Sequence, residues 1–126
     1  MQLTTNFHLD EFKCNDGTPV PEEYLENVKL LAKNLQVLRD FVGKPITINS
    51  GYRSPHYNDV VIKGAKRSQH KLATAADIKI RGIRPREVQG IIEELIKDNR
   101  MHDGGLGYYS SFTHYDVREN SARWKG

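Results

Sequence analysis

Two stretches of this chain repeat apolar residues with the period of an α-helix, and these stretches constrain the fold most. In residues 21–43 the apolar positions recur at steps of three and four: Leu25, Val28, Ala32, Leu35, Leu38 and Val42. Pro21 suits the first position of a helix, where the missing N–H costs nothing, and Gly43 suits its end. A second stretch opens at Pro85, and its stripe is Val88, Ile91, Ile92, Leu95 and Ile96. Helices with one apolar face must cover an apolar surface, so the chain needs a second layer.

Short segments with period two supply that layer. Residues 45–50 and 76–81 alternate apolar and polar side chains, which predicts strands with one buried face. Residues 108–118 form either one last strand or a strand pair with a bend at Ser110–Ser111, and one face of it carries Phe112, His114, Asp116 and Arg118. The glycine-rich segment 98–107 is predicted to be a flexible turn. The tail, residues 120–124, is expected to act as a terminal staple, with its tryptophan packed against the rest of the domain. The pattern therefore predicts an α+β fold with a small sheet.

Length and composition limit the classes of protein. The 126 residues indicate one domain, 1–126, with residues 1–20 as an irregular N-terminal arm fastened by Phe7, Leu9 and Phe12. The single cysteine, Cys14, excludes an internal disulfide and a multi-cysteine zinc site, and is expected to pack as a small hydrophobic residue. The net charge of +3 is mild and the basic residues are scattered among acids, so a nucleic-acid groove is disfavoured.

The composition also bears on targeting, and we expect neither a membrane span nor a secretion signal in these residues. No apolar run approaches the ~18 residues of a membrane span, so none is expected. The first residues lack the basic flank and apolar centre of a secretion signal, so we expect synthesis in the cytoplasm. The sequence does not indicate an export route.

Three residues far apart in the sequence have the chemistry of zinc ligands. His70 lies on a turn, Asp77 at the start of the strand that follows it, and His114 on the polar face of the last strand. If these two strands pair, Asp77 and His114 become cross-strand neighbours. Two imidazoles and one carboxylate around Zn²⁺ leave a fourth position for a water of lowered pKa, as in catalytic sites. Each imidazole also needs a partner for its other nitrogen, which Ser68, Asp116 or a backbone carbonyl could provide.

Arg53 follows the strand at residues 45–50, in a loop rich in glycine, serine and proline. Three interpretations stay open from the residues alone. Arg53 is a solvated surface cation, a structural fork that binds loop carbonyls, or a clamp for a substrate carboxylate held by two parallel hydrogen bonds.

The order of these motifs resembles one known family. The motifs are Ser50-Gly51-Tyr52-Arg53-Ser54 with Tyr57-Asn58, Ser68-x-His70 with Ala75 and Asp77, Gly105-x-Gly107-x-Tyr109, Phe112-x-His114-x-Asp116-x-Arg118, and Ala122-Arg123-Trp124. Together they look like the zinc D-Ala-D-Ala carboxypeptidase family, in particular its short bacterial and phage peptidoglycan peptidases. The resemblance covers nearly all of the chain from Phe7 onward.

This resemblance implies a hedgehog/DD-peptidase fold, in which helices pack on one face of a small, mostly antiparallel sheet and a zinc cleft opens on the other. It implies His70, Asp77 and His114 as ligands of Zn²⁺. It places Arg53 near the substrate's carboxylate or developing oxyanion, and we expect Tyr52 and Ser68 to contact substrate. The expected activity is that of a monomeric zinc metallopeptidase that hydrolyses peptide bonds in peptidoglycan stems, as a carboxypeptidase or an endopeptidase.

The chain departs from the family pattern at two positions. Ala73 stands where the family usually has glycine, which raises the question of whether the loop needs a positive φ. Ser111 stands where several relatives place an acidic general base, three residues before the last histidine. Asp116 is the available carboxylate, and it either orients His114 or takes the proton from the attacking water. The missing acid keeps a rival interpretation open, namely a non-catalytic zinc-containing module of the same fold that binds cell-wall peptide or a phage structural partner.

Overall fold

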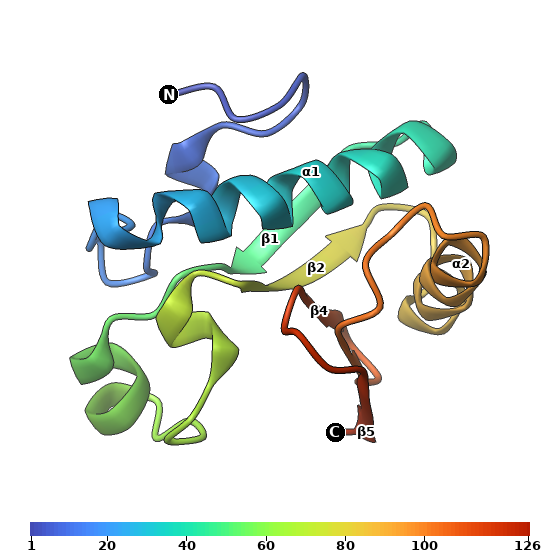
Figure 1. Ribbon diagram of the computed structural model, residues 1–126. Coiled ribbons are helices and arrows are strands. Elements are labelled where there is room, and N and C mark those ends of the chain that lie inside the picture. The colour runs from blue at the N-terminus through green and yellow to red at the C-terminus, as the bar shows by residue number, and fades with distance from the viewer.

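A computed structural model describes residues 1–126, and its centre is a five-stranded sheet (Figure 1). The order of the strands across the sheet is β1-β2-β4-β3-β5. Their bounds are Ile46–Ser50 for β1, Ala75–Ile80 for β2, Gly105–Tyr108 for β3, Thr113–Asp116 for β4 and Ala122–Lys125 for β5. Every neighbouring pair is antiparallel except β3 and β5, which are parallel. The predicted α+β architecture is therefore confirmed.

The two predicted helices are present and pack against one face of the sheet. They are α1 (Leu25–Val42) and α2 (Pro85–Lys97). The apolar stripes share one core with the inward side chains of the sheet, which include Ile78, Leu106 and Tyr115. Neither helix combines the length and the apolar character that a membrane span requires.

The ends of α1 differ in how well the sequence predicts them. Gly43 ends the helix as expected, with a left-handed φ of 67° and its N–H bonded to the carbonyl of Arg39. At the other end, Pro21 precedes a 3-10 turn, Glu22–Tyr24, and the α-helix starts only at Leu25. Proline and the two acids are compatible with either kind of helical turn, so composition alone does not separate them.

The N-terminal segment packs into the hydrophobic core beside β1. Phe7 and Phe12 are fully buried and their ring centroids lie 6.0 Å apart, while Leu9 is partly buried. The carbonyl of Phe12 accepts a hydrogen bond from the N–H of Tyr52 at 2.8 Å. Cys14 is buried beside them. Residues Phe7, Leu9 and Phe12 thus fasten this segment as the sequence predicts.

One row of residues crosses the sheet in register, and we call it the site row. Its members are paired from strand to strand: Ser50 with Asp77, Asp77 with His114, His114 with Gly107, and Gly107 with Trp124. Because directly paired residues point to the same face, all these side chains lie on the face away from the helices. The sheet therefore brings together residues from all five strands at one place.

Two of these strands were not predicted. Residues 98–107 were expected to be a turn, but β3 begins at Gly105; the tail was expected to be a staple, but it forms β5. The strand pair considered for 108–118 is displaced toward the N-terminus: its first strand, β3, ends at Tyr108, and residues 109–112 connect it to β4. Glycine lowers the apparent strand propensity of β3, yet its neighbours require it. A Cβ on Gly105 would lie 2.2 Å from Oδ2 of Asp116, and one on Gly107 would lie 2.8 Å from the ring of Trp124.

Candidate metal centre

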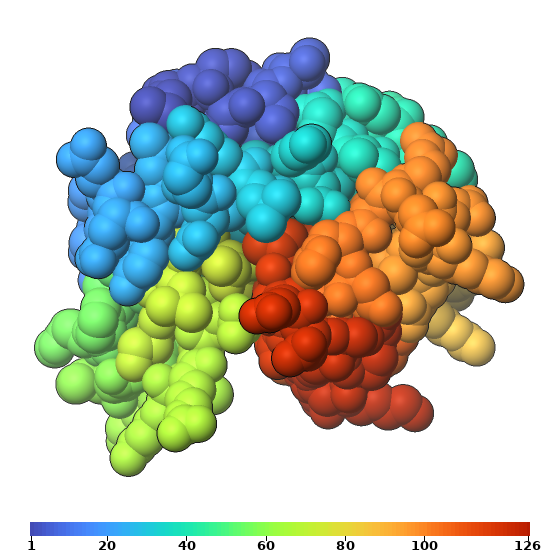
Figure 2. Space-filling model, viewed as in Figure 1, coloured from blue at the N-terminus to red at the C-terminus, as the bar shows by residue number.

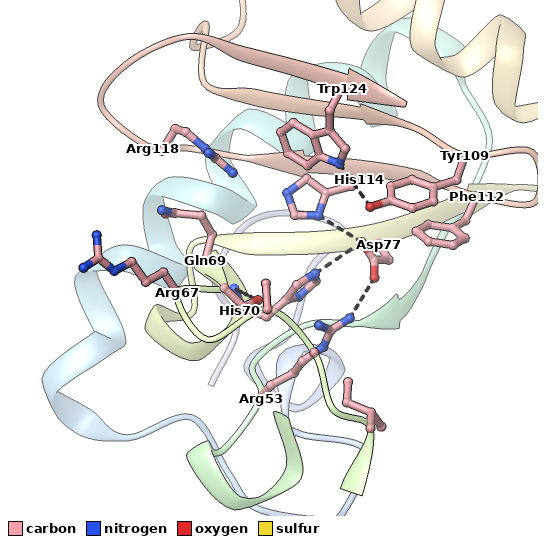
Figure 3. A pocket seen from close by; sticks show the side chains of 14 residues that line it. Arg53, Arg67, Gln69, His70, Asp77, Tyr109, Phe112, His114, Arg118 and Trp124 are labelled. Carbon is pink, nitrogen blue, oxygen red and sulfur yellow. Dashed lines mark hydrogen bonds and ion pairs between the residues drawn. The ribbon is translucent and has the colours of Figure 1, made fainter. Parts of the chain in front are cut away.

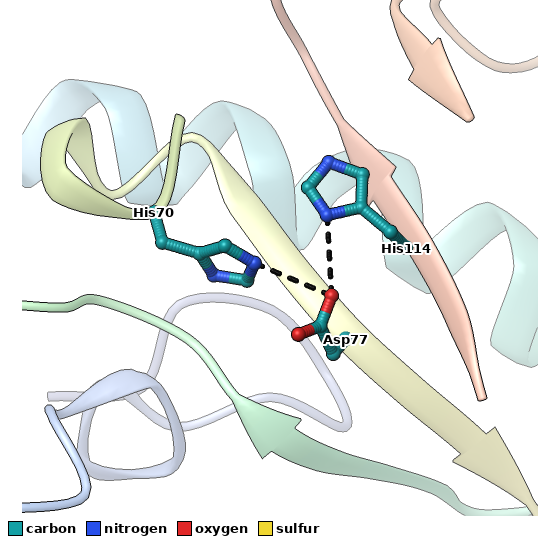
Figure 4. Close-up of side chains that lie close together, drawn as sticks. All are labelled: His70, Asp77 and His114. Carbon is teal, nitrogen blue, oxygen red and sulfur yellow. Dashed lines mark hydrogen bonds and ion pairs between the residues drawn. The ribbon is translucent and has the colours of Figure 1, made fainter. Parts of the chain in front are cut away.

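His70, Asp77 and His114 meet on the open face of the sheet (Figure 4). His70 comes from a 3-10 turn, Gln69–Leu72, which begins where Oγ of Ser68 accepts the N–H of His70. Oδ1 of Asp77 lies 3.2 Å from Nε2 of His70 and 3.1 Å from Nδ1 of His114. One ligand atom of each residue lies within 4.8 Å of the others, and all three residues are buried.

The outer nitrogens of the two imidazoles determine where their protons are. Nδ1 of His70 lies 2.7 Å from the carbonyl oxygen of Gly51, which can only accept, so this nitrogen carries the hydrogen. Nε2 of His114 lies 2.7 Å from Oδ2 of Asp116 and likewise donates. In the neutral rings, Nε2 of His70 and Nδ1 of His114 therefore turn lone pairs toward the carboxylate of Asp77.

This arrangement fits a divalent cation. Two nitrogen lone pairs and a carboxylate oxygen that converge within hydrogen-bond distance repel one another unless a positive charge lies between them. Imidazole nitrogen and carboxylate oxygen are donors that Zn²⁺ accepts, and three protein ligands leave a fourth position open. The donor set therefore matches a catalytic type of zinc site.

Burial and neighbouring groups shift the pKa of all three side chains, and for Asp77 and His70 the shift favours the form that binds metal. Burial would raise the pKa of Asp77, but its close contacts with His114 and His70 outweigh that effect and hold the pKa below its ordinary value. Burial lowers the pKa of His70, although Asp77 opposes the shift. Burial would also lower the pKa of His114, but Asp116 and Asp77 raise it. The carboxylate is thus ionised and His70 neutral near pH 7.

Asp116 lies behind His114 and is completely buried. Its Oδ1 accepts the N–H of Gly105 at 2.9 Å, and the N–H and Nε of Arg118 at 3.0 and 2.9 Å. Its Oδ2 accepts Nη2 of Arg118 at 2.7 Å in addition to His114. Burial would raise the pKa of Asp116, but His114 and Arg118 lower it. Every contact of this carboxylate therefore holds it in place within the protein.

The centre lies at the base of a cleft of about 560 Å³ (Figure 3). Figure 2 shows the hollow between the segment around residues 57–72, in green and yellow-green, and the C-terminal strands in red. The first wall includes Arg53, Arg67 and Ser68, and the second includes Tyr109, Phe112, His114, Arg118 and Trp124. His70, Asp77 and His114 all line this cleft.

A model of the peptidase M15 family matches residues 4–116, a span that contains His70, Asp77 and His114. The chain belongs to the peptidase M15 family. No curated protein matches it. The family and the cluster of His70, Asp77 and His114 agree on a metallopeptidase, and the resemblance found from the motifs is confirmed.

Other residues predicted for the site of this M15 chain lie in different environments. Arg53 lines the cleft, where its Nη2 donates to Oδ2 of Asp77 at 3.2 Å and its Nε to Oγ of Ser50 at 3.1 Å. Ser68 also lines the cleft. Tyr52 instead lies in the core, 4% exposed, with its ring centroid 6.3 Å from that of Tyr24. Tyr52 is therefore a packing residue in this structure and does not reach the cleft.

The second wall of the cleft contains residues that the sequence did not assign to the site. Trp124 was expected to act as a staple, but its ring lies 4.9 Å from that of His114. Tyr109 and Phe112 stack on each other at 4.4 Å beside it. The available signal was the alternating pair Gly105-x-Gly107, because glycines at every second position of a strand leave one face free for neighbouring side chains.

The two departures from the family pattern have clear positions in the M15 chain. Ala73 has a φ of 59°, so the loop after His70 does adopt the left-handed conformation that glycine enters more easily. Ser111 is exposed and does not line the cleft. Asp77 is the only carboxylate among the residues that line the cleft.

Acid should destabilise the metal-free M15 chain through Asp77 and Asp116. Both carboxyls have a pKa below the ordinary value in the folded state, so the unfolded chain binds more protons once the pH falls below about 4. Their contribution is complete above that pH and is lost as the pH falls further. We expect urea unfolding between pH 5 and 3, by circular dichroism, to show this loss, and Asp116→Asn to make the decline shallower. A pH-independent free energy of unfolding across this range would contradict the prediction.

Proposed function

We propose that this protein is a zinc peptidase that hydrolyses peptide bonds in the stems of bacterial peptidoglycan, as a D-Ala-D-Ala carboxypeptidase or as an endopeptidase. The observation that carries the proposal is the convergence of two imidazole lone pairs and one carboxylate at the base of an open cleft. Membership of the peptidase M15 family supports it. When bound, zinc would supply Lewis-acid chemistry by lowering the pKa of a water and polarising a carbonyl.

The protein's own residues would bind the metal and orient its ligands. His70, Asp77 and His114 would hold the ion. Asp116 keeps the hydrogen of His114 on Nε2, so that Nδ1 is free to bind metal. Of the two roles considered for Asp116, its complete burial and its contacts support orientation of His114 rather than direct proton transfer with a water in the cleft.

Arg53 is suited to bind the negative charge of the substrate. Its side chain is 16% exposed, and its contacts with Asp77 and Ser50 hold the guanidinium at the edge of the cleft. A fixed guanidinium there would bind the carboxylate of the stem peptide or the oxygen that becomes negative in the transition state. Ser68 adds a hydroxyl on the same wall, and its oxygen already accepts the N–H of His70.

Arg53→Lys should reduce turnover strongly while the protein keeps its zinc. Lysine preserves the charge but lacks the planar fork that contacts both Asp77 and Ser50, so we expect kcat to fall by about 100-fold. The matched control is Arg84→Lys, because Arg84 is an exposed residue at the start of α2. Steady-state hydrolysis of a stem peptide and zinc content measured on the same samples check this. Equal rates in Arg53→Lys and wild type would remove Arg53 from the chemistry.

Mass spectrometry of muropeptides incubated with the zinc-loaded protein tests the proposed activity. A peptidase releases D-alanine or creates new amino termini, and the released fragment identifies the bond. One structural feature favours the second candidate, a binding module: Asp77 is the only carboxylate lining the cleft, and Ser111 supplies none. Protein that holds zinc and binds muropeptides but releases no product would establish the module instead.

A further inference from the structure

Tyr109 is part of a sequence motif to which the proposed function gives no role. It follows β3 directly and lines the wall of the cleft that includes Trp124 and Phe112. Figure 3 shows its hydroxyl group at the end of the ring that faces His114 and Asp77. The hydroxyl is therefore placed beside the metal centre, on the other wall from Ser68.

The hydrogen bonds around this hydroxyl leave its proton free. Nε1 of Trp124 lies 3.0 Å from the oxygen of Tyr109, and an indole N–H can only donate. The oxygen of Tyr109 is thus the acceptor, and no protein group accepts the hydrogen that it carries. The neighbouring Tyr108 differs, since its hydroxyl donates to Glu93. Tyr109 therefore has an unused donor in the cleft.

Packing holds the hydroxyl in position before any ligand arrives. The ring of Tyr109 stacks on that of Phe112 with an interplanar angle of 14°. Trp124 in turn packs against His114 and lies under the guanidinium of Arg118, 5.0 Å from the ring centroid. Because Gly107 has no side chain, it leaves room for the indole of Trp124. An oriented donor of this kind can stabilise charge without reorganising during the reaction.

We infer that Tyr109 is a catalytic hydrogen-bond donor to the scissile carbonyl oxygen as that oxygen becomes negative, and that Trp124 is the residue that positions it. No covalent bond to Tyr109 forms, and its proton stays on the phenol. The inference rests on the proposed peptidase function. In this inference the neutral hydroxyl of Tyr109 and the guanidinium of Arg53 act together on the negative charge.

Tyr109→Phe tests the donor, because it removes one oxygen and keeps the stacked ring. We expect kcat on a stem peptide to fall by about 10- to 100-fold, with KM and zinc content nearly unchanged, since the interaction forms mainly in the transition state. Tyr108→Phe is the matched control and should stay within about twofold of wild type, because that hydroxyl is bonded to Glu93. A wild-type kcat in Tyr109→Phe would overturn the catalytic role.

Trp124→Phe tests the positioning role, because it deletes the indole N–H and keeps an aromatic ring. It should lower kcat by about 3- to 10-fold, and combining it with Tyr109→Phe should cost no more than Tyr109→Phe alone, since the two residues act as a unit. Independent, multiplicative losses would show that Trp124 does not act through Tyr109.

A measurement of binding separates this inference from the proposed function. A phosphinate dipeptide, in which a tetrahedral phosphorus replaces the scissile carbonyl, is titrated calorimetrically into zinc-loaded wild type and Tyr109→Phe. We expect the variant to bind about tenfold more weakly, because the phosphinate oxygen accepts from Tyr109. Equal affinities would overturn the role of Tyr109 even if wild type cleaves stem peptides. Wild type that neither cleaves a stem peptide nor binds the phosphinate would contradict both proposals.

Discussion

Replacing His114 with alanine should reduce the zinc content of the purified protein from about one ion per chain to almost none. The variant leaves Asp77 and His70 as ligands, and two protein ligands do not hold zinc firmly enough to retain it through purification. It also removes the group that connects the metal centre to Asp116. Turnover should be lost together with the metal. Metal analysis of protein purified without chelator checks the prediction directly.

The control for this variant is His56→Ala. His56 is exposed and lies outside the cleft, so this variant should keep its zinc. Circular dichroism of both variants shows whether the fold is retained, and His70→Ala provides a second test of the ligand set from another element. Equal zinc content in wild type and His114→Ala would refute the assignment of the centre.

Asp116→Asn has the second largest expected effect, because it changes the tautomer of a ligand. An asparagine can keep its oxygen toward Gly105 and Arg118, but its NH2 group then faces Nε2 of His114, which is also a donor. His114 relieves this conflict by moving its hydrogen to Nδ1, and the lone pair is lost to the metal. We expect zinc affinity to fall by about 10- to 100-fold.

Zinc titration of turnover distinguishes the two roles considered for Asp116. If Asp116 orients His114, saturating zinc restores much of the rate of Asp116→Asn. If it takes the proton from the attacking water, the rate stays low at full occupancy. Asp103→Asn is a suitable control, since Asp103 is a surface partner of Arg123. An unchanged zinc affinity in Asp116→Asn would show that the hydrogen bond to His114 has no influence on the metal.

The sequence predicted the two helices, and it predicted that His70, Asp77 and His114 come together, because both depend on which face of each element is apolar. The stripe of α1 and the alternation around Asp77 and His114 are visible within a few residues, and pairing of β2 with β4 then brings the ligands together. The family motifs supported the same residues. The helices and the cluster both follow from the pattern of apolar and polar residues along the chain, and this pattern is visible in the sequence.

The wall formed by Trp124 was not predictable in the same way. It depends on the parallel pairing of β5 with β3, a contact between strands whose own sequences are glycine-rich or short. Tyr52 shows the opposite difficulty. It adjoins Arg53 in a motif, yet consecutive residues point in different directions, and only the packing against Tyr24 reveals that it faces the core.

The site row also gives the protein a built-in optical probe. Trp124 is the only tryptophan, and its indole lies against the imidazole of His114. The fluorescence of the unlabelled chain therefore arises beside the metal centre, apart from the weaker tyrosines. Loading with a paramagnetic ion such as Co²⁺ should quench that emission, so occupancy can be followed in real time without modifying the molecule.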